Sequence, residues 1–191
     1  MYFCNMSQDS FKIIGIDPGT NIMGYAVLSV SGTELKVEDL GVLKMQKLKD
    51  HQSKLKEIFL QTQDIIETYQ PKIMAIESPF FGKNVQAMLK LGRAQGVAIA
   101  AAITMGLDVF EYSPKKIKQS ITGSGNASKE QVSAMLNHIL KVKINSKYLD
   151  ATDALATAIC HHNQSSANKI VGKRYNDWSS FITDNTGRVK K

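Results

Sequence analysis

The stretch Lys12-Ile13-Ile14-Gly15-Ile16-Asp17-Pro18-Gly19-Thr20 decides how the rest of the chain is interpreted. Its apolar run has the length of a β-strand, and Pro-Gly prevents further sheet pairing. Such a run is typical of a strand that is buried on both faces, which places Asp17 close to the core. A buried carboxylate must be paired, neutralised or bound to a metal ion. An aspartate before Pro-Gly is also ordinary turn chemistry, so this stretch alone leaves both interpretations open.

Length and composition indicate one domain with a tail. The chain has 191 residues, of which 43% are hydrophobic, enough for an ordinary core. The longest apolar run, Val97 to Ile103, is too short to span a bilayer, and we see no secretion signal. Two cysteines, Cys4 and Cys160, make neither a disulfide framework nor a metal cluster. We therefore expect a cytoplasmic protein with reduced thiols and no membrane partner.

The formal net charge of +7 is unevenly distributed. The segment from Lys115 to Lys147 carries seven lysines and one acid, and the segment from Asn163 to Lys191 carries six basic residues and two acids. The rest of the chain has a net negative charge. An acidic site beside basic segments suits a polyanion held through its phosphates. A solvated lysine-rich face is the alternative, and it is the commoner meaning of a charge run.

The first half of the chain predicts an antiparallel meander, a helix and a second strand that ends in an acid. After the first strand, the predicted elements are strands at 23–30 and 34–45, a helix at 52–69 and a strand at 72–77. The strand at 72–77 repeats the plan of the first, because its apolar run closes on Glu77. We expect Asp17 and Glu77 side by side at the ends of neighbouring parallel strands, where open α/β sheets place their sites.

The second half predicts mainly helices. They are expected at 84–104, from Ser113-Pro114 onward, at 128–140 and at 150–162, with a strand at 108–112. In the first of these helices Gly92, Gly96 and Ala100 form a stripe of small residues. We expect this stripe to pack on the sheet of the same domain, with a dimer partner as the alternative. Residues 1–163 would form the domain, and residues 164–191 a basic, mobile tail.

Four carboxylates carry the predicted chemistry. Asp150 and Asp153 lie three residues apart, on one face of the first turn of a helix, and join Asp17 and Glu77. An all-oxygen set suits Mg²⁺ or Mn²⁺ and argues against zinc. Two such ions would stabilise the attacking and leaving oxygens of a phosphodiester displacement, which predicts hydrolysis by a metal-activated water. As alternatives, Asp150 only caps the helix, and the carboxylate of Asp153 only interacts favourably with the partial positive charge at the N-terminal end of the helix.

Several motifs together resemble the RuvC family of bacterial Holliday-junction resolvases, in order from about Lys12 to His162. These motifs are Gly15-Ile16-Asp17-Pro18-Gly19-Thr20, Ala75-Ile76-Glu77, the stretch from Lys83-Asn84 to Gly96, and Asp150-Ala151-Thr152-Asp153-Ala154-Leu155-Ala156. The resemblance implies a ribonuclease-H-like α/β fold with a five-stranded mixed sheet flanked by helices. It also implies a homodimer that binds four-way DNA junctions and makes paired symmetric nicks using Mg²⁺ in recombination and DNA repair. The branch-migration proteins RuvA and RuvB are the partners that it suggests.

The resemblance also implies roles for individual residues. The family's catalytic, metal-binding carboxylates match Asp17, Glu77, Asp150 and Asp153, with two Mg²⁺ ions expected per site and Mn²⁺ as a substitute. Phe80 matches an aromatic that stacks on bases at the opened junction, and a core phenylalanine is the alternative. Lys118 and Lys129 match lysines near the scissile phosphate, where an ammonium offsets negative charge; exposed surface lysines are the alternative.

Two other classes of protein remain open at this point. The stretch from Ile14 to Thr20 looks like the first phosphate loop of sugar kinases and actin-like ATPases. Those proteins need two such lobes around the nucleotide, and this chain is too short for both. A non-catalytic junction-binding module would need only the basic segments. The presence of four acids argues against it, because buried carboxylates without a function only cost stability.

Overall fold

The computed structural model describes residues 10–79, 84–141 and 149–170, with side chains described up to residue 165. A five-stranded sheet has the order β3-β2-β1-β4-β5. The strands are β1 (Phe11–Asp17), β2 (Ile22–Ser31), β3 (Glu34–Lys44), β4 (Ile73–Glu77) and β5 (Asp108–Tyr112). The helices are α1 (His51–Tyr69), α2 (Val85–Thr104), α3 (Pro114–Thr122), α4 (Lys129–Leu140) and α5 (Leu149–Ile170). These elements lie close to the predicted ones.

Strand β1 occupies the centre of the sheet. It pairs with β2 in antiparallel and with β4 in parallel orientation, and β4 pairs in parallel with β5. The sheet is therefore mixed, as expected. Ile13, Ile14 and Ile16 are completely buried, which confirms that this strand is covered on both faces.

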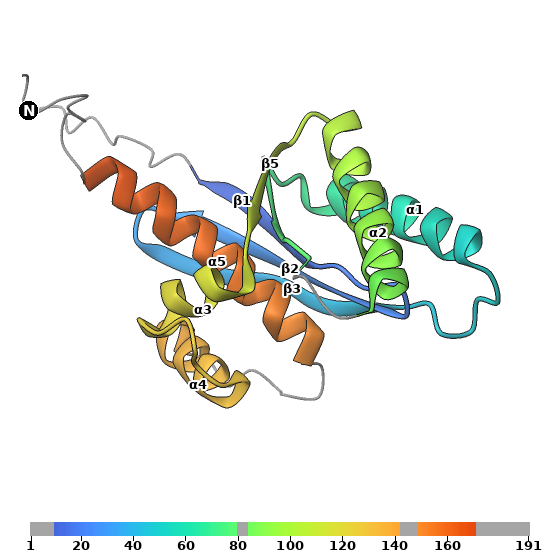
Figure 1. The fold of residues 1–191 in the computed structure, drawn as a ribbon. Coiled ribbons are helices and arrows are strands. Elements are labelled where there is room, and N and C mark those ends of the chain that lie inside the picture. The colour runs from blue at the N-terminus through green and yellow to red at the C-terminus, as the bar shows by residue number, and fades with distance from the viewer. Residues whose placement is uncertain (1–9, 80–83, 142–148, 171–191) are drawn as a thin grey trace, which may run out of the picture.

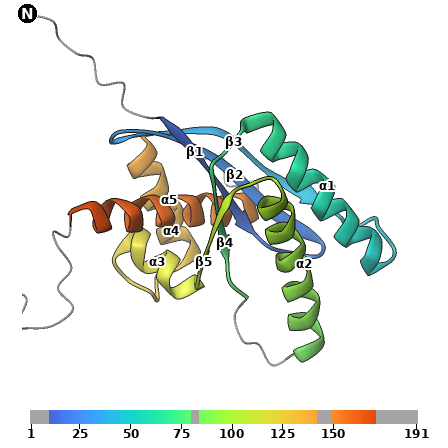
Figure 2. The same ribbon diagram turned by 90° about the horizontal axis from the view of Figure 1, so that it is seen from above.

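Helices cover both faces of the sheet. Figure 2 shows α1 and α2 on one side and α3, α4 and α5 on the other. Side chains of β1 alternate between the two cores: Ile13 contributes to the core under α5, and Ile14 and Ile16 contribute to the core under α1 and α2. Long helix α5 runs across the sheet (Figure 1). Helix α4 reaches its N-terminal part through Lys129 and Asp153, and α3 contacts it at Cys160 and Asn163.

Capping side chains define where four of the helices begin. Asp50, Asn84, Ser113 and Ser128 each accept a hydrogen bond from a backbone N–H in the first turn of the helix that follows. Ser128 also forms a capping box with Gln131. These caps confirm the starts of α2, α3 and α4 that the sequence predicted.

The small-residue stripe of α2 faces solvent, and not the sheet as predicted. Gly92, Gly96 and Ala100 are exposed, and an added Cβ at either glycine would meet no atom within 4 Å. The prediction that this stripe packs on the sheet is therefore wrong. A second small face, which includes Ala94 and Ala98, is completely buried instead. Both faces have helical spacing, so the periodicity of the sequence did not distinguish them.

Helix α5 is longer than the sequence predicted. The apolar pattern stops near His162, but the helix continues to Ile170, so its predicted end was wrong. Adding residues to an existing helix costs little, because each one gains a backbone hydrogen bond. Asn163 also anchors this region, since its Nδ2 donates to the carbonyl of Ser120 at 3.2 Å. The proposed tail from residue 164 thus begins as helix and otherwise lies outside the described residues.

The two cysteines, a buried histidine and the question of a membrane span complete the description of the fold. Cys160 is buried as a free thiol in α5, whereas Cys4 lies outside the described residues. His161 is buried, and its Nδ1 lies 2.8 Å from the hydroxyl of Tyr112. A bilayer-crossing helix, with the length and apolar character that this requires, is absent from the part of the chain that the structure describes.

Candidate active site

Two of the predicted acids lie at the ends of adjacent parallel strands. Asp17 is the last residue of β1, and Glu77 is the last residue of β4. The residues before them, Ile16 and Ile76, are paired in the parallel register. The two carboxylates therefore leave the sheet at the same edge, which confirms the arrangement expected from the matching strand patterns.

Glycines in the sheet bring the other two acids to this edge. A Cβ at Gly15 would collide with the carbonyl oxygen of Ala154, and a Cβ at Gly24 would collide with that of Asp150. The backbone of α5 therefore rests directly on β1 and β2. This close approach fixes the first turns of α5, and with them Asp150 and Asp153, beside the strand ends.

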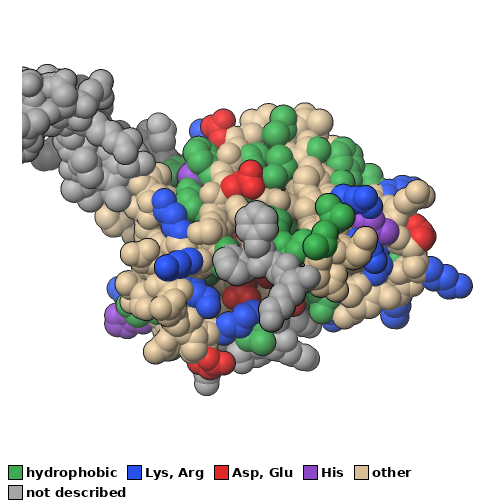
Figure 3. Space-filling view, in the orientation of Figure 1, with side chains coloured by type: hydrophobic (Ala, Val, Ile, Leu, Met, Phe, Trp, Pro, Cys, Tyr) green, Lys and Arg blue, Asp and Glu red, His purple; other side chains and the backbone are tan. Residues whose placement is uncertain are grey.

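The site residues surround one cavity of about 240 Å³, which we call the acidic cavity. The charged residues that line it are Asp17, Glu77, Asp153, Lys118 and Lys129. Asp150 does not line the cavity, but it is close enough to act on the charge of Asp17. Figure 3 shows acidic side chains recessed in the surface beside a group of basic ones. Six of the seven predicted site residues are thus brought together; Phe80 lies outside the described residues.

Burial and mutual repulsion raise the pKa values of the two strand-end acids. The pKa of Asp17 rises to about 8, first because the side chain is desolvated and then because Glu77, Asp153 and Asp150 repel its negative charge. The pKa of Glu77 rises to about 7, mainly through desolvation and then through Asp153. Positive charge on Lys129 opposes both shifts, and Lys118 opposes that of Glu77. Ionising all four acids together is therefore unfavourable, even with the two lysines beside them.

Lys129 partly offsets the repulsion between the acids. Its Nζ donates to Oδ2 of Asp153 at 2.6 Å, and this hydrogen bond raises the pKa of Lys129. Lys129 is the first residue of α4, directly after the Ser128 cap, so the capping box fixes the backbone from which it reaches α5. The ammonium thus remains charged at neutral pH next to the acids.

The donor set fits a hard divalent cation by its chemistry. All the candidate ligands are carboxylate oxygens, and two of them have raised pKa values that a nearby positive charge would lower. The side chains surround the cavity loosely: within residues 10–79, 84–141 and 149–165, no three His, Cys, Asp or Glu side chains form a ready coordination group. The acids are therefore gathered at the cavity, and their role as ligands remains a prediction.

The alternatives considered for these residues are partly resolved. Asp150 is not the cap of α5, because it is the second residue of the helix, in its first turn. Lys118 and Lys129 both line the cavity, while the side chain of Lys129 is also 55% exposed, so the role of the two lysines at the phosphate stays a prediction.

The apolar residues that form one wall of the cavity were not identified from the sequence, and neither was Gly24, whose lack of a side chain lets α5 pack directly on β2. Pro114, Ile117 and Val132 form that wall, from α3 and α4. Gly24 had a usable signal, since an isolated glycine within a strand pattern indicates a close backbone approach. The wall had none, because its spacing is that of any amphipathic helix.

A mixed five-stranded sheet, with acids at two adjacent strand ends and on a helix packed across the sheet, defines the ribonuclease-H-like class of α/β folds. The sequence matches the family model of crossover junction endodeoxyribonuclease RuvC over residues 13–161. The chain therefore belongs to the RuvC family.

Individual relatives agree with this assignment. The chain is 56% identical to the crossover junction endodeoxyribonuclease RuvC of Cytophaga hutchinsonii, over 93% of this chain and 88% of that protein. It is 50% identical to the RuvC of Bacteroides fragilis, over 93% of this chain and 95% of that protein. The structure of Thermus thermophilus RuvC in complex with a Holliday junction substrate is similar at a TM-score of 0.77 and 28% identity, covering 83% of this chain and 96% of that one.

Proposed function

We propose that this protein is a metal-dependent endonuclease that resolves four-way DNA junctions by paired symmetric nicks, in recombination and DNA repair in the cytoplasm. The observation that carries the proposal is the convergence of acids from β1, β4 and α5 with lysines from α3 and α4 on one cavity. Membership of the RuvC family supports the choice of substrate, because the similar Thermus protein is described in complex with a Holliday junction.

Within this proposal, carboxylate oxygens of Asp17, Glu77, Asp150 and Asp153 would hold Mg²⁺, with two ions per site and Mn²⁺ as a substitute. When bound, the ions supply an activated water and stabilise the oxygens of the phosphodiester displacement. The chain's own contribution is to gather the four acids without His or Cys and to keep the strand-end pair partly desolvated.

The two lysines act on the phosphate rather than on the acids alone. Lys118 lies close enough to Glu77 to lower its pKa, and Lys129 holds Asp153 at 2.6 Å. A scissile phosphate that enters the cavity would meet both ammonium groups. Each would offset the negative charge that develops on the phosphate oxygens. We retain Phe80 as the residue that stacks on bases at the opened junction.

The proposal includes a homodimer formed through α2, because paired nicks need two active sites. The exposed stripe of Gly92, Gly96 and Ala100 continues into large apolar side chains, of which Val85 is 67% and Leu89 is 52% exposed. A second copy of this helix would cover that face. RuvA and RuvB remain expected partners from family membership.

Replacement of Leu89 by Glu tests the dimer. We expect Leu89→Glu to shift the protein towards monomer in sedimentation velocity, because a charge would be buried in the interface. Leu60→Glu on α1 is the matched control, since Leu60 is also exposed, at 44%. An unchanged dimer in Leu89→Glu, or equal dissociation of both variants, would remove α2 from the interface.

A synthetic mobile four-way junction with labelled strands tests the function as a whole. We expect two symmetric nicks with Mg²⁺ and none with a chelator. Tight binding without nicking under any divalent ion would support a non-catalytic binding module instead. ATP hydrolysis without DNA cleavage would support the phosphate-loop interpretation.

A further inference from the structure

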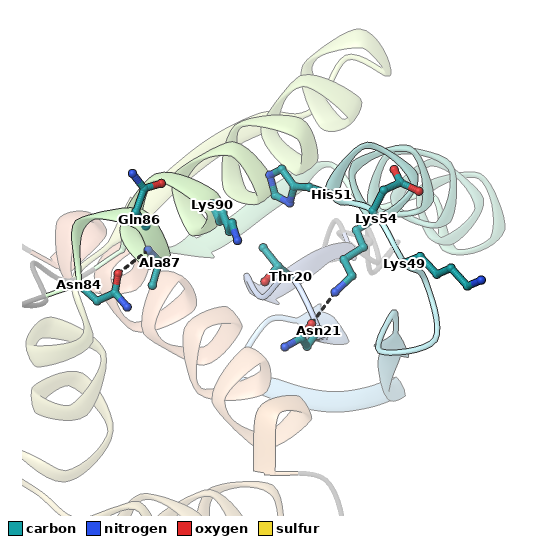
Figure 4. Close-up of a pocket in the computed structure, with 10 residues that line it drawn as sticks. Thr20, Asn21, Lys49, His51, Lys54, Asn84, Gln86, Ala87 and Lys90 are labelled. Atoms are coloured by element: carbon teal, nitrogen blue, oxygen red, sulfur yellow. Dashed lines mark hydrogen bonds between the residues drawn. The ribbon is translucent and has the colours of Figure 1, made fainter.

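A second hollow, of about 370 Å³, lies between the turn after β1 and the N-terminal ends of α1 and α2 (Figure 4). We call it the lysine pocket, and the residues used below are Thr20, Asn21, His51, Lys54 and Lys90. Three segments that are far apart in the sequence meet here: the turn after β1 and the N-terminal turns of α1 and α2.

The lining of the lysine pocket has uncompensated positive charge. It includes Lys49, Lys54 and Lys90, and within the described ranges none of the three forms an ion pair. Asp50 is the one carboxylate in the lining, and it accepts hydrogen bonds at 2.7 Å from both the backbone N–H and the hydroxyl of Ser53. That carboxylate caps α1, and its single negative charge leaves the three lysines in excess.

Several polar side chains of the pocket can donate hydrogen bonds to a bound group that accepts them. Lys54 donates to Oδ1 of Asn21 at 2.6 Å, so the amide of Asn21 keeps its own donor group available. Figure 4 shows Lys90 and His51 directed towards Thr20, whereas Lys49 points away. Nε2 of His51 is buried and has no hydrogen-bond partner within the described part of the chain. A buried polar atom of this kind needs a partner.

The position of the pocket relates it to the acidic cavity. Thr20 follows Asp17 by one short turn, so the two hollows meet at the same sheet edge. The acidic cavity is on the α3, α4 and α5 side, and the lysine pocket is on the α1 and α2 side. The N-terminal ends of α1 and α2 add partial positive charge there. A DNA strand with one phosphate in the cavity would cross this edge.

We propose that the lysine pocket binds a backbone phosphate of the DNA whose scissile phosphate occupies the acidic cavity, with Lys54, Lys90, His51 and Thr20 as its contacts. This proposal rests on the proposed function and adds a second anchor to it. Contacts with phosphate fix the register of bound DNA without reading its sequence. The pocket would thus position the strand, while the acids cleave it.

Charge-removing variants that keep a hydrogen-bond donor test the proposal. Lys54→Gln and Lys90→Gln are compared with Lys56→Gln, whose lysine is exposed on the same helix as Lys54 but outside the pocket lining. Binding of the four-way junction is measured without divalent ions at several KCl concentrations. We expect each pocket variant to bind about 3- to 10-fold more weakly and to reduce the slope of log affinity against log salt by about one. Lys56→Gln should change neither quantity.

The outcomes separate this proposal from the proposed function. If both pocket variants kept the wild-type salt slope, the pocket would not bind a phosphate and the proposal would be wrong. It would also be wrong if Lys56→Gln lost as much affinity as the pocket variants, because any lysine on this surface would then have the same effect. Restoration of the wild-type slope by Lys90→Arg would support it. Nicking by the wild-type protein is measured in parallel, and its absence would overturn the nuclease assignment whatever the slopes show.

Discussion

The acidic cavity and the lysine pocket lie at one edge of the sheet, but the strand-end acids of the cavity are more buried than Lys90 of the pocket. In the cavity, Asp17 and Glu77 are desolvated enough that their pKa values rise to about 8 and about 7. In the pocket, Lys90 is exposed. Groups that act on reacting atoms benefit from a dry, fixed environment, whereas groups that hold a polyanion need only positive charge near its path. The comparison predicts that substitutions in the acidic cavity change the rate of nicking, and that substitutions in the lysine pocket change the affinity for the junction.

Replacement of Asp17 by Asn should have the largest effect. The amide keeps the size of the side chain but removes a metal-binding oxygen, so we expect junction nicking to fall on the order of 10³-fold or more. Affinity for the junction should remain within a few-fold of wild type. Single-turnover cleavage and metal-free binding assays measure the two quantities. A preserved cleavage rate would remove Asp17 from the metal site.

Replacement of Gly24 by Ala should break the packing that brings the acids together. Its Cβ would collide with the carbonyl of Asp150, so α5 must move away from β2. We expect a loss of about 1–3 kcal/mol in the free energy of unfolding, together with slower nicking. Urea denaturation measures the first quantity, with Ser29→Ala on the same strand as the control. Unchanged stability and unchanged nicking in Gly24→Ala would show that this contact does not position the acids.

The raised pKa of Asp17 predicts how stability depends on pH. The folded protein keeps the Asp17 proton up to about pH 8, whereas an unfolded aspartate loses it near its ordinary value of 3.8. The folded state thus binds more protons between these values, and this residue's contribution to stability falls as pH rises. Without metal, Asp17→Asn should be close to wild type near pH 4 and exceed it at pH 9 by several kcal/mol, at most about 6, which is the equivalent of a pKa that rises from 3.8 to about 8.

Thermal unfolding of both proteins across that pH range provides the measurement. Added Mg²⁺ should reduce the difference at high pH, since the cation compensates the charge of the carboxylate. A difference that is independent of pH would show that Asp17 is ionised in the folded protein throughout this range.

Replacement of Lys118 by Gln should have the smallest effect and sharpens the contrast with the lysine pocket. Lys118 lies in the cavity, so its loss should slow single-turnover nicking about 10-fold and leave the salt dependence of binding nearly unchanged. Lys115→Gln, on the exposed side of the same helix, is the control. If Lys118→Gln weakened binding without slowing cleavage, the division between rate and affinity would be wrong.

Much of the fold and of the acidic cavity could be predicted, because the relevant signals are local. An apolar run that ends in an acid marks β1 and β4, and Ser or Asn before a helical pattern marks the caps. The rest depends on contacts between distant segments. The sequence of α2 has two small faces, and only the packed structure shows that Ala98 is buried while Gly96 is exposed.

The same limit applies to the charged groups. The ion pair between Lys129 and Asp153 joins residues 24 apart in the chain, and no periodicity relates them. The lysine pocket combines the turn after β1 with the N-terminal turns of α1 and α2, and in the sequence each of these segments has the composition of ordinary polar surface. The length of α5 was missed because its last residues are polar, and hydrophobic periodicity does not report a helix that continues into solvent.

Manganese binding in crystals is the most direct test of the central claim, that acids from three elements hold divalent ions at the acidic cavity. Crystals soaked in Mn²⁺ should show anomalous density in that cavity, about 2.0–2.2 Å from carboxylate oxygens of Asp17 and Glu77 and of at least one of the α5 aspartates. Mn²⁺ bound elsewhere, with the cavity empty while the same protein nicks junctions in Mn²⁺, would contradict the account.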